Sequence, residues 1–273
     1  MLSTIRWYNI LLTIFAQYLS AYTIMLHAKM PLYQLVTDYK LHAIVLASVF
    51  SIAGGFIINN FYDYEKDLIN RPHLTIFTRI ISKKTTLNLY ILFNILTILV
   101  ALSASLKIGL FFLIFISALW IYSHKLQKMP FIKEFAASVL SITSFFAIVL
   151  HYNRFYNFIF IYGVFFMSLV YSRELIKQFM NYNGDKAINI SSIPVLLGID
   201  KAIYFSNFIM VLSIFCGLSI VSIFGWSTGS YFLILALITI AINLVLLQKH
   251  QYKLINTLYK VLIVLGIANI LLV

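Results

Sequence analysis

The sequence predicts an all-α membrane protein, with nine transmembrane helices around a central cavity. Of its 273 residues 62% are hydrophobic and only 10% are charged, and the mean hydropathy is +0.95. A water-soluble domain needs about a quarter of its residues charged. Long stretches without Asp, Glu, Lys or Arg alternate with short charged segments, and the stretches approach the ~20 residues that span a bilayer core. We therefore expect a single transmembrane domain over residues 1–273.

The charge-free stretches give the spans in chain order. One stretch, Ala202–Gln248, is too long for a single helix and breaks between Gly225 and Gly229, because two glycines favour a turn. The last span begins near Ile255 and contains Lys260, a cation that can reach the surface or face a polar cavity. The four prolines fall between spans, as uninterrupted helices require. The other spans are Trp7–Leu26, a retained helix rather than a cleaved signal, Leu41–Tyr62, Thr85–Leu106, Ile108–Ser123, Phe135–Asn153 and Phe155–Ser172.

The charged residues predict how the helices are oriented. Most of the Lys and Arg residues belong to the N-terminus and to the loops after the second, fourth, sixth and eighth spans. Because positive loops stay in the cytoplasm, we place this side and the N-terminus there, in a bacterial inner membrane. The same side holds every acidic residue except Asp38. We therefore expect the active site at the cytoplasmic side.

The bulk charge and the single cysteine exclude other classes of protein. The net charge is +12, but the basic residues are sparse and tied to span ends, so we expect membrane lipids or an anionic substrate as partners and no nucleic acid. Cys216 is the only cysteine and lies in an apolar stretch. Neither a disulfide framework nor a thiolate metal site can be built from it.

Polar residues gather at the end of the second span. Asn59, Asp63 and Asp67 are spaced four residues apart, so on a helix they form one stripe, with Asn60 beside it. Clustered carboxylate and amide oxygens suit Mg²⁺, which often bridges to substrate phosphates. The simpler interpretation is that the acidic residues only end the helix at the membrane surface, balanced by Lys66 and Arg71.

A second polar segment, residues 173–186, follows the sixth span and aligns with the first. Residues 60–67 and 178–185 match amide to amide, Phe to Phe, Tyr to Tyr and, at the end, Asp67 to Asp185. This pattern indicates an internal repeat, whose two related halves could bring two half-sites to one cavity. Chance similarity over eight positions is the alternative.

Together these segments resemble the two aspartate-rich motifs of the UbiA-type intramembrane prenyltransferases. Residues 59–72 are similar to the first motif, NDxxDxxxD followed by an Asn-Arg-Pro turn, and residues 173–186 to the second. Weaker supporting matches extend over nearly the whole chain: Arg6 and Asn9, Tyr122-Ser123 with Pro130, and Ile193-Pro194-Val195 with Gly198.

The resemblance implies transfer of a polyprenyl chain from a prenyl diphosphate to a lipophilic acceptor, with Mg²⁺ held between the motifs and the diphosphate. The acceptor is expected to be an aromatic quinone precursor or a glycerol-ether lipid. The expected catalytic residues are Asp63, Asp67 and Asp185. These three, with Asn59 and Asn181, are the expected metal ligands. The expected diphosphate contacts are Asn60, Arg71, Arg173, Lys177, Gln178 and Lys186, with Lys125 and Lys128 as further candidates.

The chain departs from the family pattern at three amides. Family members usually have Asp where this chain has Asn60, Gln178 and Asn181. An amide oxygen can ligate a hard cation but brings no charge, so the second half-site should bind metal more weakly, with Glu65 and Glu174 as nearby helpers. Two other functions stay open: a non-catalytic protein that binds polyprenyl lipids, and a transporter built on repeated half-sites.

Overall fold

The computed structural model describes residues 7–64, 68, 82–187, 189–225 and 230–270, and the elements in these ranges are all helical. Eight of the described helices are long and apolar enough to cross a membrane, which confirms an integral, multi-pass membrane protein. The ninth predicted span coincides with α13 (Tyr252–Asn269), which has lysines and asparagines along its 18 residues and is not among the eight. Its crossing of the membrane stays a prediction.

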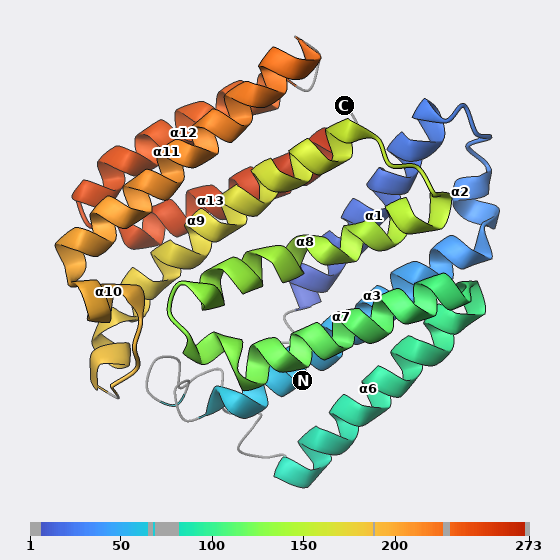
Figure 1. Ribbon diagram of the computed structural model, residues 1–273, viewed down its shortest axis with the longest axis horizontal. Helices are drawn as coiled ribbons and strands as arrows, with labels where there is room; N and C mark the ends of the chain where they lie inside the picture. Colours follow the sequence, from blue (N-terminus) through green and yellow to red (C-terminus); the bar gives the residue numbers. More distant parts are fainter. Residues whose placement is uncertain (1–6, 65–67, 69–81, 188, 226–229, 271–273) are drawn as a thin grey trace. The chain divides into compact units, whose positions relative to one another are not determined.

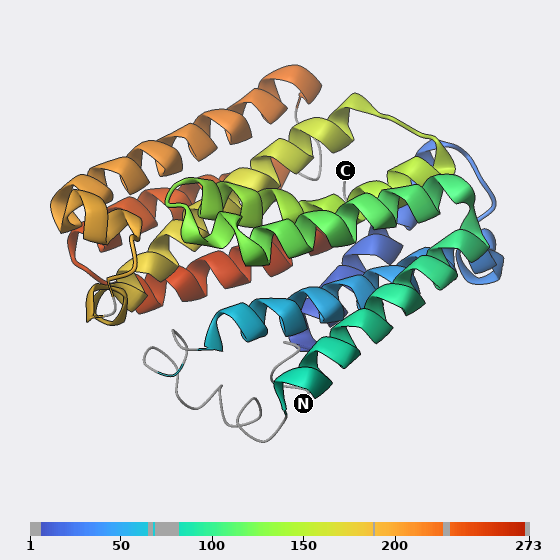
Figure 2. The ribbon, with the colours of Figure 1, turned by 60° about the horizontal axis from the view of Figure 1, so that its bottom comes forward.

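The chain divides into two compact units, residues 1–127 with 143–154, and residues 128–142 with 155–273. The first unit contains α1 (Trp7–His27), α2 (Gln34–Thr37), α3 (Tyr39–Tyr62), α6 (Lys83–Ala104), α7 (Leu106–His124) and the second half of α8 (Ile132–Tyr152). Within it α3 lies along α6 and α7, and α6 and α7 pack on each other (Figure 1, Figure 2). Gly55 lets α3 approach α7 closely, since a Cβ there would lie 3.2 Å from Leu119.

Helix starts in the first unit follow from polar caps in the sequence. Ser82 accepts a hydrogen bond from the Thr85 N–H and begins α6, and Ser105 accepts one from the Ile108 N–H and begins α7. Such side-chain caps satisfy backbone donors that a helix leaves unpaired. Because Ser105 is the only residue between α6 and α7, these helices form a tight hairpin.

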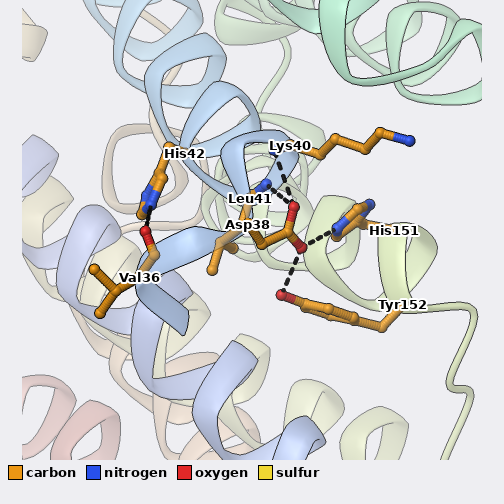
Figure 3. Close-up of polar contacts among 7 residues, drawn as sticks. All are labelled: Val36, Asp38, Lys40, Leu41, His42, His151 and Tyr152. Carbon is orange, nitrogen blue, oxygen red and sulfur yellow. Dashed lines mark hydrogen bonds and ion pairs between the residues drawn. The ribbon is translucent and has the colours of Figure 1, made fainter. Parts of the chain in front are cut away.

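Polar contacts of Gln17 and Asp38 with other helices further hold the first unit. The fully buried Gln17 of α1 donates through Nε2 to Ser48 Oγ of α3 and to the Ser144 carbonyl of α8, both at 2.8 Å. Asp38 caps α3 through the N–H groups of Lys40 and Leu41, as Figure 3 shows. Its other oxygen pairs with His151 Nε2 at 2.8 Å and accepts from the Tyr152 hydroxyl at 3.3 Å, while the Lys40 side chain points away.

The second unit contains the first half of α8, then α9 (Asn157–Ala187), α10 (Ile193–Leu197), α11 (Ile199–Phe224), α12 (Ser230–Gln248) and α13. α9 packs against α11 and α13, and α12 packs against the same two helices (Figure 1). Phe165, Phe232 and Tyr259 are among the largest side chains of its apolar core. Gly225 ends α11 with φ of 74°, which confirms the start of the predicted break, whereas residues 226–229 lie outside the described part.

The predicted end of the sixth span is wrong. The helix α9 does not stop at Ser172 but runs through Ala187, with 31 residues in all, so the segment 173–186 is helical. At 1.5 Å per residue it is about 46 Å long, more than the ~30 Å of the hydrocarbon core. The charged residues continue the helix instead of ending it because they find partners: Lys177 pairs with Glu174 one turn earlier at 2.6 Å.

Candidate active site

Asn59 and Asp63 lie together at the end of α3. Asn59 Nδ2 donates to Asp63 Oδ2 at 2.8 Å, and the Asp63 N–H donates to the Asn59 carbonyl at 2.9 Å. This confirms that the two residues share one helix face, as their spacing predicts. Both side chains, like Asn60, are half-buried, so the carboxylate stays accessible while one oxygen is held by the amide.

The end of α7 carries aromatic neighbours of this helix end. Tyr62, next to Asp63, has its hydroxyl 3.1 Å from His124 Nδ1, and the His124 ring stacks on Trp120 at 5.2 Å. Lys125 directly follows as the exposed cap of α7, and Lys128 is exposed at the end of a short 3₁₀ helix, Leu126–Lys128. The remaining candidates of the first motif, Glu65, Asp67 and Arg71, lie outside the described residues.

The candidates of the second motif lie along α9. Glu174, Gln178, Asn181 and Asp185 are spaced so that they share one face of this helix. Gln178 and Asp185 are buried, whereas Glu174 and Asn181 are half-buried. The polar face of α9 is therefore partly buried inside the protein and partly accessible at its surface.

Gln178 has a role in the fold that sequence reasoning missed. Its side chain is 3% exposed; Oε1 accepts from the Ile193 N–H of α10 at 2.7 Å, and Nε2 donates to Glu134 Oε1 of α8. The expected contact with a diphosphate does not fit this position, because both ends of the amide are used inside the protein. A carboxylate at 134 and a backbone N–H at 193 cannot be linked to position 178 from spacing alone.

The basic candidates of the second motif differ in how firmly they are held. Arg173 Nε donates to Asn256 Oδ1 of α13 at 3.2 Å, and Lys177 pairs with Glu174. Lys186 is exposed, with its ammonium 5.8 Å from the centre of the Tyr182 ring. These three cations lie along the last four turns of α9, where an anion near the helix end could meet them.

The oxygen ligands present suit a hard cation, but the described residues alone do not complete a metal centre. No group of three or more His, Cys, Asp or Glu side chains is gathered for a metal within the described ranges. Asp63 offers a half-buried carboxylate, and the buried Glu134 has one oxygen, Oε2, without a hydrogen-bond partner among the described residues. Carboxylates of this kind fit Mg²⁺.

Comparison with solved structures shows the fold. A UbiA homologue from Archaeoglobus fulgidus, described as bound to DMAPP and Mg²⁺, matches with a TM-score of 0.74 and 16% identity over 98% of this chain and 96% of the other. A structure described in terms of digeranylgeranylglyceryl phosphate synthase in membranes matches with a TM-score of 0.73 and 20% identity. The match covers 99% of this chain and 97% of the other chain.

Sequence comparison identifies relatives and the family. A digeranylgeranylglyceryl phosphate synthase of Methanosphaera stadtmanae is 30% identical over 166 residues, 59% of this chain and 60% of the relative. That of Sulfolobus acidocaldarius is 32% identical over 54% of this chain and 53% of the relative. The match thus spans little more than half the length of these curated relatives. The model of the UbiA prenyltransferase family matches residues 10–265, and the chain belongs to this family.

Proposed function

We propose that the protein transfers a prenyl group from a prenyl diphosphate to a glycerol-phosphate lipid within the membrane, in a Mg²⁺-dependent reaction. Family membership supports prenyl transfer, and the name shared by the two relatives supports the lipid acceptor, because it denotes a product with two geranylgeranyl chains on glyceryl phosphate. None of the relatives reported above is named for a quinone precursor, the other acceptor that the sequence left open.

In this reaction the bond between the allylic carbon and the diphosphate oxygen breaks. A hydroxyl oxygen of the acceptor forms an ether bond to that carbon and loses its proton, and the diphosphate leaves as an anion. Mg²⁺ would supply positive charge to the leaving diphosphate. Apolar helices keep water from the reacting carbon, and the many apolar side chains that α7, α11 and α12 expose suit a protein surrounded by lipid tails.

The Asn59–Asp63 contact is the observation that carries the proposal. The amide of Asn59 fixes one carboxylate oxygen of Asp63 at 2.8 Å, which orients the carboxylate without neutralising it. We assign Asp63, together with Asp67, to the metal held by the first motif, with Asn60 and Arg71 toward the diphosphate. Fixing a ligand in advance lowers the cost of ordering it when the metal and substrate bind.

In the second motif we assign Asp185 and Asn181 to a second metal ion and the three cations of α9 to the diphosphate. Arg173 is already held by Asn256 and Lys177 by Glu174, so little side-chain entropy is lost when they meet an anion. Lys125 and Lys128 are further candidates because both are exposed. We place this chemistry and the N-terminus on the cytoplasmic side; the relatives come from archaea, so they do not favour a bacterial host.

Purified protein in lipid nanodiscs tests the proposal. Labelled geranylgeranyl diphosphate, Mg²⁺ and geranylgeranylglyceryl phosphate should give the diether product, whereas 4-hydroxybenzoate as acceptor should give none. Asp63→Asn should lower kcat by about 100-fold or more, with an unchanged melting temperature. The matched control is Asp200→Asn, an exposed carboxylate at the start of α11.

Two results would contradict the proposal. Undiminished Mg²⁺-dependent transfer by Asp63→Asn would remove the first motif from the reaction. Binding of the diphosphate without any turnover by the unchanged protein would favour the non-catalytic lipid-binding protein instead.

A further inference from the structure

Glu134, in the first turn of α8, has a carboxylate that is almost completely buried. The residue is 1% exposed. Its Oε1 accepts from Gln178 Nε2 and lies 3.3 Å from Lys133 Nζ, whereas Oε2 has no hydrogen-bond partner within the described part of the chain. A buried carboxylate oxygen without a donor is costly, so this atom identifies a place where a positively charged partner would be stabilising.

The orientation of Gln178 is fixed by the backbone. The Ile193 N–H can only donate, and it lies 2.7 Å from Gln178 Oε1. The amide oxygen must therefore face α10, and the NH₂ group must face α8. This group requires an acceptor, which Glu134 provides. Gln178 thus acts as an anchor that holds the Glu134 carboxylate against the polar face of α9.

The charged side chains near Glu134 leave its Oε2 without a hydrogen bond within the described part of the chain. Glu174 lies one turn before Gln178 on the same face of α9. Lys133 lies beside Oε1 of Glu134, and Lys177 pairs with Glu174. A divalent ion at Oε2 would give this buried oxygen the partner that the described residues do not provide.

We infer that Glu134 supplies the carboxylate charge of the second motif: its Oε2 is a ligand for a divalent cation, and Gln178 positions it. The negative charge thus comes from Glu134 on α8, which is hydrogen-bonded to Gln178. The inference rests on the proposed function only in that the cation is the one that accompanies the diphosphate.

Exchanging the residue types at positions 134 and 178 tests this inference. Glu134→Gln removes the charge without changing the size of the side chain. In the double variant Glu134→Gln/Gln178→Glu the carboxylate moves to α9, where it can still accept from the Ile193 N–H and from the new amide at 134. Mn²⁺ binding to the full chain in detergent is measured by EPR, with Mg²⁺ as competitor. We expect about tenfold weaker Mn²⁺ binding for Glu134→Gln and recovery to within about threefold in the double variant.

A further variant keeps the test decisive if Glu134→Gln does not fold. Gln178→Glu alone sets two carboxylates against each other, so Mn²⁺ should bind more tightly than to the unchanged protein and should raise the melting temperature of this variant more. Asp200→Asn serves as the control and should bind Mn²⁺ like the unchanged protein.

The outcomes separate this inference from the proposed function. The inference is overturned if the unchanged protein binds no Mn²⁺ or if Glu134→Gln binds Mn²⁺ equally well. It is also overturned if the double variant does not recover Mn²⁺ binding, or if Gln178→Glu binds Mn²⁺ no more tightly than the unchanged protein. Mn²⁺ binding that follows the carboxylate in a protein without prenyl transfer would sustain the inference and refute the function. Prenyl transfer by a protein whose Mn²⁺ binding is unchanged in these variants would support the function and refute the inference.

Discussion

The two polar segments align in sequence, yet their side chains lie in different surroundings. Asn59 and Asp63 bond to each other within the last turn of α3 and are half-buried. Gln178 is buried in the middle of α9's polar segment and bonds to two other elements, α8 and α10. The first segment presents a half-buried carboxylate beside an amide, whereas the second uses its amide to hold the fold. Similar residue patterns can therefore place their side chains in different surroundings, one near the surface and one inside the protein.

The largest expected loss of stability comes from removing the buried side-chain amide of Gln178. Gln178→Ala leaves the Glu134 carboxylate and the Ile193 N–H buried without this partner, so we expect a loss of about 3–5 kcal/mol in the free energy of unfolding. Asn60→Ala, the aligned but half-buried amide, should cost about 1 kcal/mol or less. Titration with SDS in mixed micelles, followed by circular dichroism, measures both. Equal losses for the two variants would contradict the comparison.

A second contrast concerns close packing at glycines in the two units. A Cβ at Gly266 of α13 would lie 2.5 Å from Phe166 and 2.7 Å from Phe232, whereas one at Gly54 of α3 would meet nothing closer than 3.5 Å. Gly266→Ala should therefore cost about 1–3 kcal/mol by overpacking. Gly54→Ala should be neutral or stabilise by up to about 1 kcal/mol, since Ala favours the helix.

The same titration checks this pair of glycine variants. If Gly266→Ala were as stable as the unchanged protein, the aromatic side chains around it would have to move freely. The contrast between the two units would then not hold.

The sequence predicted the parts of the structure that depend on local chemistry. Charge-free stretches mark the helices because lipid tolerates few charges, and the spacing of Asn59 and Asp63 predicts their contact because a helix repeats every 3.6 residues. The end of the sixth span could not be predicted in this way. Charges show where a helix leaves the apolar layer, not where it ends, and the Glu174–Lys177 pair carries α9 onward.

The role of Gln178 depends on tertiary structure. Its partner Glu134 lies 44 residues away along the chain and Ile193 lies 15 residues away. No periodicity links these positions, and a lone Glu at the start of a span is most simply a surface charge. A glutamine in place of an expected aspartate was the one available signal that this position had changed its role.

A smaller effect is expected at Asp38 in the first unit. Partial burial alone would raise the pKa of this carboxyl, but the hydrogen bond and charge of His151 and the N–H groups of Leu41 and Lys40 together lower it. A lowered pKa in the folded state means that the carboxylate stabilises the fold above its unfolded pKa of about 3.9. This stabilisation is lost as the pH falls through the folded pKa.

Asp38→Asn should therefore cost about 1–2 kcal/mol at pH 7 and progressively less below about pH 4. The free energy of unfolding of both proteins at pH 7, 4 and 3 measures this, with Asp200→Asn as the control for an exposed carboxylate. A difference between Asp38→Asn and the unchanged protein that does not shrink in acid would show that the charge of Asp38 is not what holds α3 to α8.

The smallest effect on stability is expected at Lys186, which lies exposed beside Tyr182 at the end of α9. Lys186→Ala should change the free energy of unfolding by less than about 0.5 kcal/mol, because the ammonium is solvated. If Lys186 contacts the diphosphate, the same variant should raise KM for the prenyl diphosphate by about fivefold to tenfold, and Lys186→Arg should restore it, since a guanidinium also binds phosphate. Steady-state kinetics at fixed Mg²⁺ measure the change. An unchanged KM in Lys186→Ala would leave the buried Asp185 of α9 and Glu134 of α8 as the groups near the second segment that remain candidates for the reaction.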